Sequence, residues 1–197
     1  MKKVFLIFTL TLFSIVNAQK RTVLVAGSVG YDNIKLSNST TDYKNNTLNL
    51  SLKIGYQFSN NLTFGIESTI SNTNSEMKGK VAEATSSDSK GSGLNIGPFL
   101  RYSKSLGGIF FAYSDLGLGI ISEKNTYSDS PDFPNKGIYA YITPALAINI
   151  KKGFCLNFSL GGLGYKSTKD GQVEVETRHT FYFNFGQQPT IGISKNF

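Results

Sequence analysis

Hydrophobic and polar residues alternate along much of this chain with a period of two. Residues 47–58 show the pattern most clearly. One set of alternate positions holds Leu48, Leu50, Leu52, Ile54, Tyr56 and Phe58, and the other holds Thr47, Asn49, Ser51, Lys53, Gly55 and Gln57. A helix would spread both sets around its circumference, so the segment predicts a β-strand with one apolar face.

The same alternation recurs and predicts eight strands in all. They cover residues 22–36, 47–58, 62–67, 94–102, 115–120, 142–150, 154–165 and 181–194. Pro98 and Pro144 lie within two of these patterns. Because proline removes a ladder hydrogen bond, we interpret both as bulges or local bends.

The connections between the strands alternate in length. Residues 59–61, 104–108 and 151–153 are short turns, whereas residues 37–46, 75–90, 124–136 and 166–178 are long and polar. Short turns at one end, long loops at the other and an even strand number are typical of bacterial outer-membrane barrels. Open edges in lipid would leave backbone groups without partners, so the sheet should close. We therefore expect an all-β fold, an eight-stranded antiparallel up-and-down transmembrane β-barrel with both termini periplasmic and four loops outside.

A soluble lipocalin-like barrel is the alternative, and it would place the apolar face inside. Aromatic residues gather on the apolar face near the short turns, where a membrane barrel has its interfacial girdle. They are Tyr56, Phe58, Phe64, Tyr102, Phe110 and Phe154. A secretory leader at the N-terminus, the unequal loops and the terminal Phe197 favour apolar side chains outside.

The N-terminus has the pattern of a cleaved secretory leader. Lys2 and Lys3 precede an apolar run over residues 4–16, and Ala18 completes a small-residue cleavage signal. The run is shorter than the roughly 20 residues of a membrane-spanning helix. We expect residues 1–18 to be a signal peptide and residues 19–197 to form one barrel domain. Loss of the two lysines lowers the net charge from +7 to +5, and no basic tract with interleaved aromatics indicates nucleic acid binding. The single Cys155 excludes an internal disulfide.

The chain closes on the strand-like segment Gly192-Ile193-Ser194-Lys195-Asn196-Phe197. With the leader and the alternating strands, this ending resembles the small outer-membrane β-barrel proteins described as porin-family proteins in Bacteroidota, related in shape to OmpX and the OmpA transmembrane domain. The resemblance implies that Phe197 is the signal read by the barrel-insertion machinery. It also implies periplasmic chaperones as partners and the outer membrane of a Gram-negative bacterium as the location.

Charged residues on the polar face form the main candidate site. Lys53 and Glu67 lie seven residues on either side of Asn60, so a simple hairpin places them opposite each other. The next strands bring Arg101 and Asp115 to the same face. Eight-stranded barrels are about filled by side chains, and charges inside them must pair. We expect a lumen ion network that plugs the barrel and sets its register. The alternatives are charges that face water near one end, or a network that gates a narrow pore.

Residues that could support other chemistry are few. His179 is the only histidine, and small barrels that modify lipid A use a histidine with Ser or Asp partners. Its parity points outward and no base-orienting partner is evident, so we predict no catalytic residue. Asp129 and Asp132 are too few for a calcium shell, and Cys155 has no metal-ligand spacing, which favours a small residue in the lumen. We expect no cofactor and no bound metal.

The prediction for function is a non-enzymatic envelope protein with a structural or surface-interacting role. Its partners would be outer-membrane lipid and lipopolysaccharide, with no nucleic acid, and the protein would be a monomer. The alternative is a narrow porin that passes ions or small solutes, and the third candidate is a lipid A-modifying enzyme that depends on His179.

Overall fold

The computed structural model describes residues 22–80, 86–127, 130–169, 177–186 and 189–197. All the regular structure in these residues is β-strand. The strands are β1 (Thr22–Ser37), β2 (Thr41–Gln57), β3 (Leu62–Gly79), β4 (Ser87–Gly107), β5 (Phe110–Tyr127), β6 (Ser130–Lys151), β7 (Phe154–Ser159), β8 (Leu163–Lys169), β9 (Thr177–Phe183) and β10 (Thr190–Asn196). None of the described residues belongs to a helix that is long and apolar enough to span a membrane.

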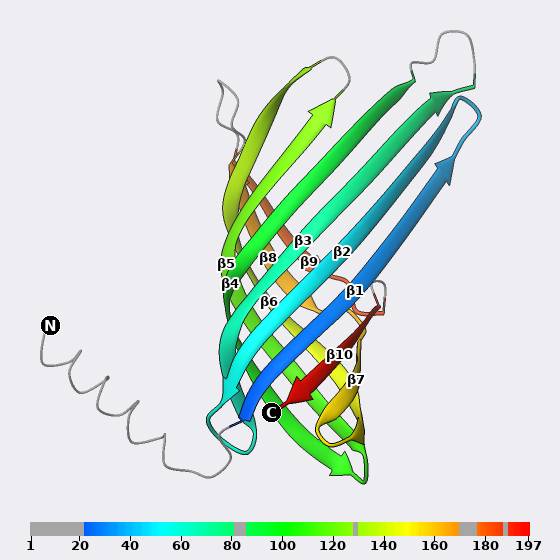
Figure 1. The fold of residues 1–197 in the computed structure, drawn as a ribbon. Coiled ribbons are helices and arrows are strands. Elements are labelled where there is room, and N and C mark those ends of the chain that lie inside the picture. The colour runs from blue at the N-terminus through cyan, green and yellow to red at the C-terminus, as the bar shows by residue number, and fades with distance from the viewer. Residues whose placement is uncertain (1–21, 81–85, 128–129, 170–176, 187–188) are drawn as a thin grey trace, which may run out of the picture.

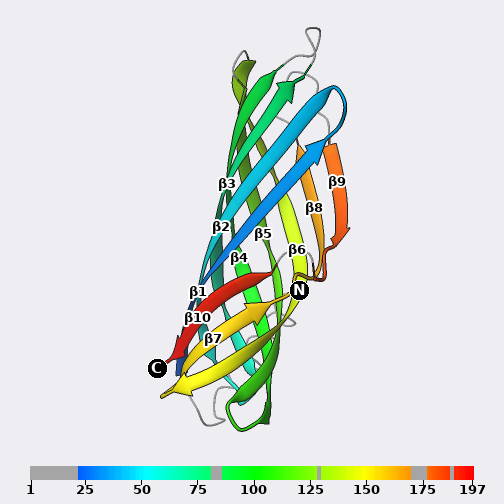
Figure 2. The same ribbon diagram turned by 90° about the vertical axis from the view of Figure 1, so that its right-hand side faces the viewer.

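Hydrogen bonds close the sheet into a ring of eight antiparallel strands. The order runs from β1 to β7 in sequence, then to β10 and back to β1 (Figures 1 and 2). The C-terminus completes the closure, because Val23 and Phe197 exchange backbone hydrogen bonds of 3.2 and 3.0 Å. The predicted eight-stranded antiparallel barrel is confirmed.

The seventh and eighth predicted strands are each divided in two. β7 and β8 both pair with β6, but Ala145 pairs with Ser159 and Ile142 pairs with Leu163, so the partner strand holds one extra residue. Gly161 absorbs it with a φ of 80°, a left-handed conformation that glycine adopts without steric cost. Within the described residues, β9 pairs with β8 alone, and β1 pairs with β10 over Leu24–Gly30.

The bulges predicted at Pro98 and Pro144 are absent: the β4–β5 and β5–β6 registers show no shift at either proline. Ile96 pairs with Ile120 and Phe99 with Gly117, so pairing omits Pro98 without a shift. Pro144 pairs with Ser114 in an unbroken β5–β6 register. Proline costs a donor but adds no residue to the strand, so the register can continue. The extra residue near Pro144 belongs to the β7–β8 break, which lies opposite it.

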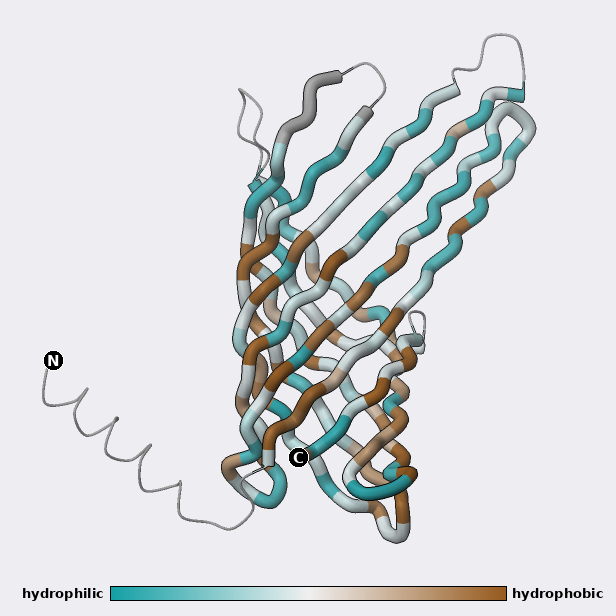
Figure 3. The backbone as a smooth tube through the Cα atoms, in the orientation of Figure 1, coloured by the Kyte–Doolittle hydropathy of each residue, from teal (hydrophilic) through white to brown (hydrophobic). Residues whose placement is uncertain are grey.

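The apolar side chains point away from the lumen. Leu52, Ile54 and Phe181 are 67%, 62% and 69% exposed, whereas the inward Phe99 and Leu24 are 1% and 3% exposed. Figure 3 shows the hydrophobic residues as a band around the barrel, with hydrophilic residues along the projecting hairpins. This arrangement is opposite to that of a soluble barrel, so the lipocalin-like alternative is wrong.

Where the structure describes them, the long polar segments predicted as loops are largely strand. The turns at residues 58–61, 108–109 and 152–153 are short, as predicted, but only residues 38–40 connect β1 to β2 and only residues 80–86 connect β3 to β4. The hairpins therefore extend beyond the apolar band and past the ends of β8 and β9 (Figures 1 and 2). Cross-strand polar contacts support them, including Thr47 to Thr73 at 3.1 Å and Ser75 to Asn45 at 3.1 Å. Most side chains on both faces of these extensions are polar, which is why hydrophobic periodicity did not identify them.

Candidate functional site

The four charged residues singled out from the sequence all point into the barrel. Lys53 on β2 is directly opposite Glu67 on β3, and Arg101 on β4 is directly opposite Asp115 on β5. The two pairs are staggered along the barrel, because Glu67 pairs with Gly97 on β4 and Arg101 pairs with Thr63 on β3. Lys53 with Glu67 and Arg101 with Asp115 are therefore two directly opposed pairs on neighbouring hairpins, at different heights in the barrel.

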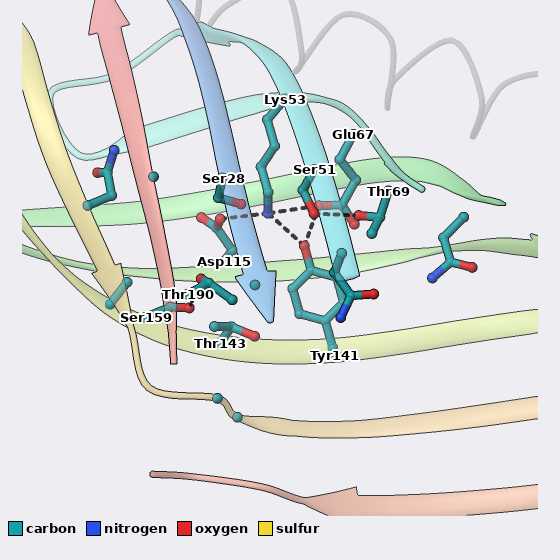
Figure 4. A pocket seen from close by; sticks show the side chains of 18 of the residues that line it. Ser28, Ser51, Lys53, Glu67, Thr69, Asp115, Tyr141, Thr143, Ser159 and Thr190 are labelled. Atoms are coloured by element: carbon teal, nitrogen blue, oxygen red, sulfur yellow. Dashed lines mark hydrogen bonds and ion pairs between the residues drawn. The ribbon is translucent and has the colours of Figure 1, made fainter. Parts of the chain in front are cut away.

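Lys53 joins the two pairs across the lumen. Its Nζ lies 2.8 Å from Glu67 Oε2 and 2.8 Å from Asp115 Oδ2, as Figure 4 shows. Arg101 donates to both oxygens of Asp115, through Nε at 2.7 Å and Nη2 at 2.9 Å. Such a two-point contact is among the stronger side-chain hydrogen-bonding arrangements. The four residues thus form one connected group, which we call the lumen ion cluster.

The side chains of the lumen ion cluster are largely buried. Glu67 and Asp115 are each 4% exposed and Arg101 is 7% exposed. The side chain of Lys53 keeps 15% of its surface accessible. None of the four side chains is exposed, so the alternative in which some of these charges face water does not describe this geometry.

Three tyrosines complete the lumen ion cluster, and the sequence reasoning missed them. Tyr139 Oη donates to Glu67 Oε1 at 3.0 Å, and Tyr141 Oη donates to the other oxygen. Tyr141 Oη also accepts from Lys53 Nζ at 2.8 Å, while the Arg101 guanidinium lies 3.8 Å from the ring centre of Tyr113. Tyr139 and Tyr141 share the parity of Thr143 on the polar face of β6, so extending that face toward the hairpin end would have found them.

Glycines make room for the aromatic rings inside the barrel. A Cβ at Gly65 would lie 2.7 Å from Phe99 Cε1, and a Cβ at Gly117 would overlap the Tyr141 ring and lie 2.7 Å from Glu67 Oε1. These distances are shorter than van der Waals contact. Gly65 and Gly117 are therefore positions at which large inward side chains from other strands pack.

A cavity of about 310 Å³ remains in the lumen around this cluster. Polar side chains line it, including Ser51, Thr69, Asn95 and Tyr182. Ser51 and Thr69 lie two residues further toward the projecting hairpins than Lys53 and Glu67, and their hydroxyl oxygens are 2.8 Å apart. The cavity is thus a polar, water-compatible space with the lumen ion cluster in its wall.

The remaining candidate residues do not form a reactive group. His179 lies exposed on the outer face, where its Nδ1 is 2.8 Å from the Tyr165 hydroxyl. Cys155 is half-buried on β7 and its Sγ is 3.9 Å from the Gly153 carbonyl. Among the described residues, no group of three or more His, Cys, Asp or Glu could hold a metal ion. Asp129 lies outside the described residues, and the structure does not describe the side chain of Asp132.

The C-terminal Phe197 lies at the closing edge of the barrel, beside the start of β1. Its side chain is 65% exposed, and the Lys195 ammonium is 4.3 Å from its ring centre. Its proposed role as an insertion signal remains a prediction. The leader and its cleavage after Ala18 fall outside the described residues.

Comparison with known proteins gives likeness of fold. No family model matches this chain, and no curated protein does. The chain is similar to Neisserial surface protein A, with 18% identity, a TM-score of 0.49, and coverage of 91% of this chain and 100% of that one. It is also similar to the outer membrane protein OprG from Pseudomonas aeruginosa, with 15% identity, a TM-score of 0.48, and coverage of 90% and 95%. The attachment invasion locus protein Ail of Yersinia pestis shares 13% identity over 91% of this chain and 99% of its own, with a TM-score of 0.42. The fold assigned to this chain rests on its own strand register.

Proposed function

We propose that this chain is a non-enzymatic outer-membrane β-barrel protein with a structural or surface-interacting role. The barrel would anchor hairpins that project from the cell surface, and the lumen ion cluster would plug it. The outward apolar band supports the location, because a closed barrel with an apolar exterior suits lipid. Delivery by the barrel-insertion machinery and periplasmic chaperones belongs to the same proposal.

The lumen ion cluster is the observation that carries the proposal. It holds two cations, Lys53 and Arg101, and two anions, Glu67 and Asp115, so its formal charge is zero. Removing a charge from water costs several kcal/mol per ion, and this cost is offset only when partners and hydrogen bonds are in place. Because Lys53 on β2 reaches Asp115 on β5, the cluster bridges non-adjacent strands across the lumen. A self-neutralised bridge stabilises a closed interior.

The projecting hairpins offer a surface for interaction. On the face that continues from the lumen, Leu36 pairs with Tyr43, and Tyr43 pairs with Met77. Leu36 is 62% exposed, Ile34 is 44% exposed and Met77 is 36% exposed. Exposed apolar side chains that adjoin one another are often found at binding surfaces. They support a surface-interacting role rather than a purely structural one.

The two alternatives have less support. A narrow porin needs an open lumen, whereas Phe99, the tyrosines and the ion cluster occupy much of an eight-stranded interior. A lipid A-modifying enzyme would depend on His179, whose described hydrogen-bond partner is Tyr165. That pair contains neither the serine nor the aspartate with which small barrels that modify lipid A combine their histidine.

Single-channel recording tests the proposal directly. Heat-modifiable migration on a gel would first show that refolded residues 19–197 form the barrel. In a planar bilayer, this folded protein should then give no single-channel openings. Glu67→Gln alters the lumen, and Glu76→Gln is its matched control on the projecting hairpin. Steady openings that change with Glu67→Gln but not with Glu76→Gln would show a narrow porin instead. Altered lipid A on gene deletion, restored by wild type but not by His179→Ala, would show the enzyme.

A further inference from the structure

Outward-facing residues change from apolar to neutral polar to cationic along the strands, going from the apolar band toward the projecting hairpins. The last apolar residues on this face, going toward the projecting hairpins, are Tyr31, Leu48, Ile70, Leu94, Ile120, Ile138 and Tyr165. Two residues further along the same strands lie Asn33, Asn46, Asn72, Ser92, Ser122, Lys136 and Ser167. Four residues further lie Lys35, Lys44, Asn74, Lys90, Lys124, Pro134 and Lys169. Apolar side chains thus give way to amides and hydroxyls, and then to ammonium groups.

This spacing places the lysines at the level of lipid headgroups. Four residues correspond to about 13 Å along a strand and roughly 9 Å along the membrane normal at a tilt near 45°. Counted along their own strands, the first outward carboxylates, Asp42, Glu76 and Asp88, come two residues beyond the lysine level. Among the described outward residues, the two levels next to the apolar band hold lysines but no carboxylate.

Two pairs of lysines face each other directly across neighbouring strands. Lys35 pairs with Lys44 between β1 and β2, and Lys136 pairs with Lys169 between β6 and β8. Like charges directly opposite each other destabilise a sheet. In the part of the chain that the structure describes, these four ammonium groups form no ion pair. Glu76 on β3 is the register partner of Lys44, but its ion pair is with Lys78, with Oε2 3.9 Å from Nζ. An external anion is what would offset the repulsion within each pair.

We propose that the two lysine pairs, Lys35 with Lys44 and Lys136 with Lys169, bind the phosphate groups of lipid A in the outer leaflet. The inference rests on the proposed outer-membrane location and assigns residues to the lipopolysaccharide contact. A phosphate monoester carries a charge of about −1.5 to −2 at neutral pH and three acceptor oxygens. It can accept hydrogen bonds from two ammonium groups at once. A phospholipid diester carries a single charge and matches one lysine rather than two.

Lipid binding by refolded residues 19–197 in a neutral detergent tests the assignment. Native mass spectrometry would compare lipid A with two phosphates, dephosphorylated lipid A and phosphatidylglycerol. Lys35→Gln/Lys44→Gln and Lys136→Gln/Lys169→Gln should each weaken lipid A binding at least about 5-fold. The matched control is Lys151→Gln/Lys152→Gln at a short turn, which should leave binding unchanged, and dephosphorylated lipid A should not bind. Unchanged binding by both lysine-pair variants overturns the proposal. Equal binding of phosphatidylglycerol, or full competition by a soluble sulfated glycan, also overturns it, because either shows a general attraction for anions.

Thermal unfolding separates lipid binding from a structural role for the lysines. Without lipid A, each lysine-pair variant should unfold at the same temperature as wild type or above it, because a repulsion has been removed. With lipid A, the midpoint should rise for wild type and rise less for the variants. Variants that unfold earlier without lipid show structural lysines and contradict the proposal. Insertion into vesicles free of lipid A tests the membrane location independently: a chain that inserts but ignores lipid A refutes this inference alone.

Discussion

Single side chains in the lumen have unequal numbers of partners, and this predicts unequal effects of mutation. Asp115 contacts both Lys53 and Arg101, whereas Glu67 contacts Lys53 and two tyrosine hydroxyls. From the sequence, only the contact between Lys53 and Glu67 could be assigned. In the structure it is Asp115 that the two cations share.

Asp115→Asn should therefore destabilise the barrel more than Glu67→Gln. Breaking a buried ion pair by removing one partner costs roughly 3 to 5 kcal/mol. We expect Asp115→Asn to fall in or above this range and Glu67→Gln near its lower end, because Lys53 keeps one carboxylate. Urea unfolding in lipid vesicles measures both. The control is Glu76→Gln, because the side chain of Glu76 is 41% exposed. An unchanged midpoint for Glu67→Gln would show that the cluster does not stabilise the fold.

A second prediction concerns Asp42, an exposed carboxylate on the projecting hairpin. The hydrogen bond from Lys80, with Nζ 2.8 Å from Oδ1, lowers the pKa of Asp42 below its ordinary value, and Ser37 adds to this effect. Because the pKa is lowered in the folded state, the interaction adds to folding stability at pH values above the unfolded-state pKa. This added stability is lost as the pH falls through the folded-state pKa. NMR titration should show the pKa of Asp42 rising toward 3.8 in Lys80→Gln. A shift of equal size in Lys44→Gln would contradict a specific hydrogen bond.

The side chains of neighbouring strands determine at which glycines an added methyl group would clash. Gly117 on β5 is packed beneath Tyr141 of β6, whereas a Cβ at Gly27 on β1 would be 3.6 Å from Leu52 in ordinary contact. Alternation along one strand identifies a glycine as inward or outward. It does not show which ring from another strand lies over it.

Gly117→Ala should destabilise the barrel and Gly27→Ala should not. The added methyl group would overlap the Tyr141 ring and approach Glu67, and overpacking typically costs about 1 to 3 kcal/mol. The unfolding midpoints of the two variants under identical conditions measure the difference. Equal midpoints would show that Tyr141 moves aside without cost. Combining Gly117→Ala with Tyr141→Phe would then show whether the hydroxyl group or the ring resists the change.

Element boundaries followed the sequence where an apolar face was present and departed from it elsewhere. The strand over residues 47–58 is recovered within β2, but β2 begins at Thr41. Its first residues, 41–46, carry mostly polar side chains on both faces of the strand, so no hydrophobic alternation marks them. Their pairing with β1 and β3 supplies the missing stabilisation. The division between β7 and β8 was likewise unpredictable, because it depends on the register of β6.

In the whole molecule, closure of the ring converts a set of polar faces into one interior. Phe197 and Val23 join the two ends of the chain, and this junction makes the lumen a shared environment for β2, β3, β4, β5 and β6. Lys53 and Asp115 are separated by 62 residues and meet only because of that curvature. A silent barrel in the conductance experiment would agree with a plug built in this way.

Local alternation by itself determined the strand pattern and placed Lys53, Glu67, Arg101 and Asp115 on the face opposite the apolar residues, because side-chain direction in a strand has a period of two. The simple hairpin also determined that Lys53 faces Glu67. Only the tertiary structure decided that Arg101 pairs with Asp115 rather than with Glu67, that Lys53 bridges both carboxylates and that three tyrosines join them. These contacts depend on the stagger between strands and on the curvature of the closed ring, and neither is encoded in the spacing along any one strand.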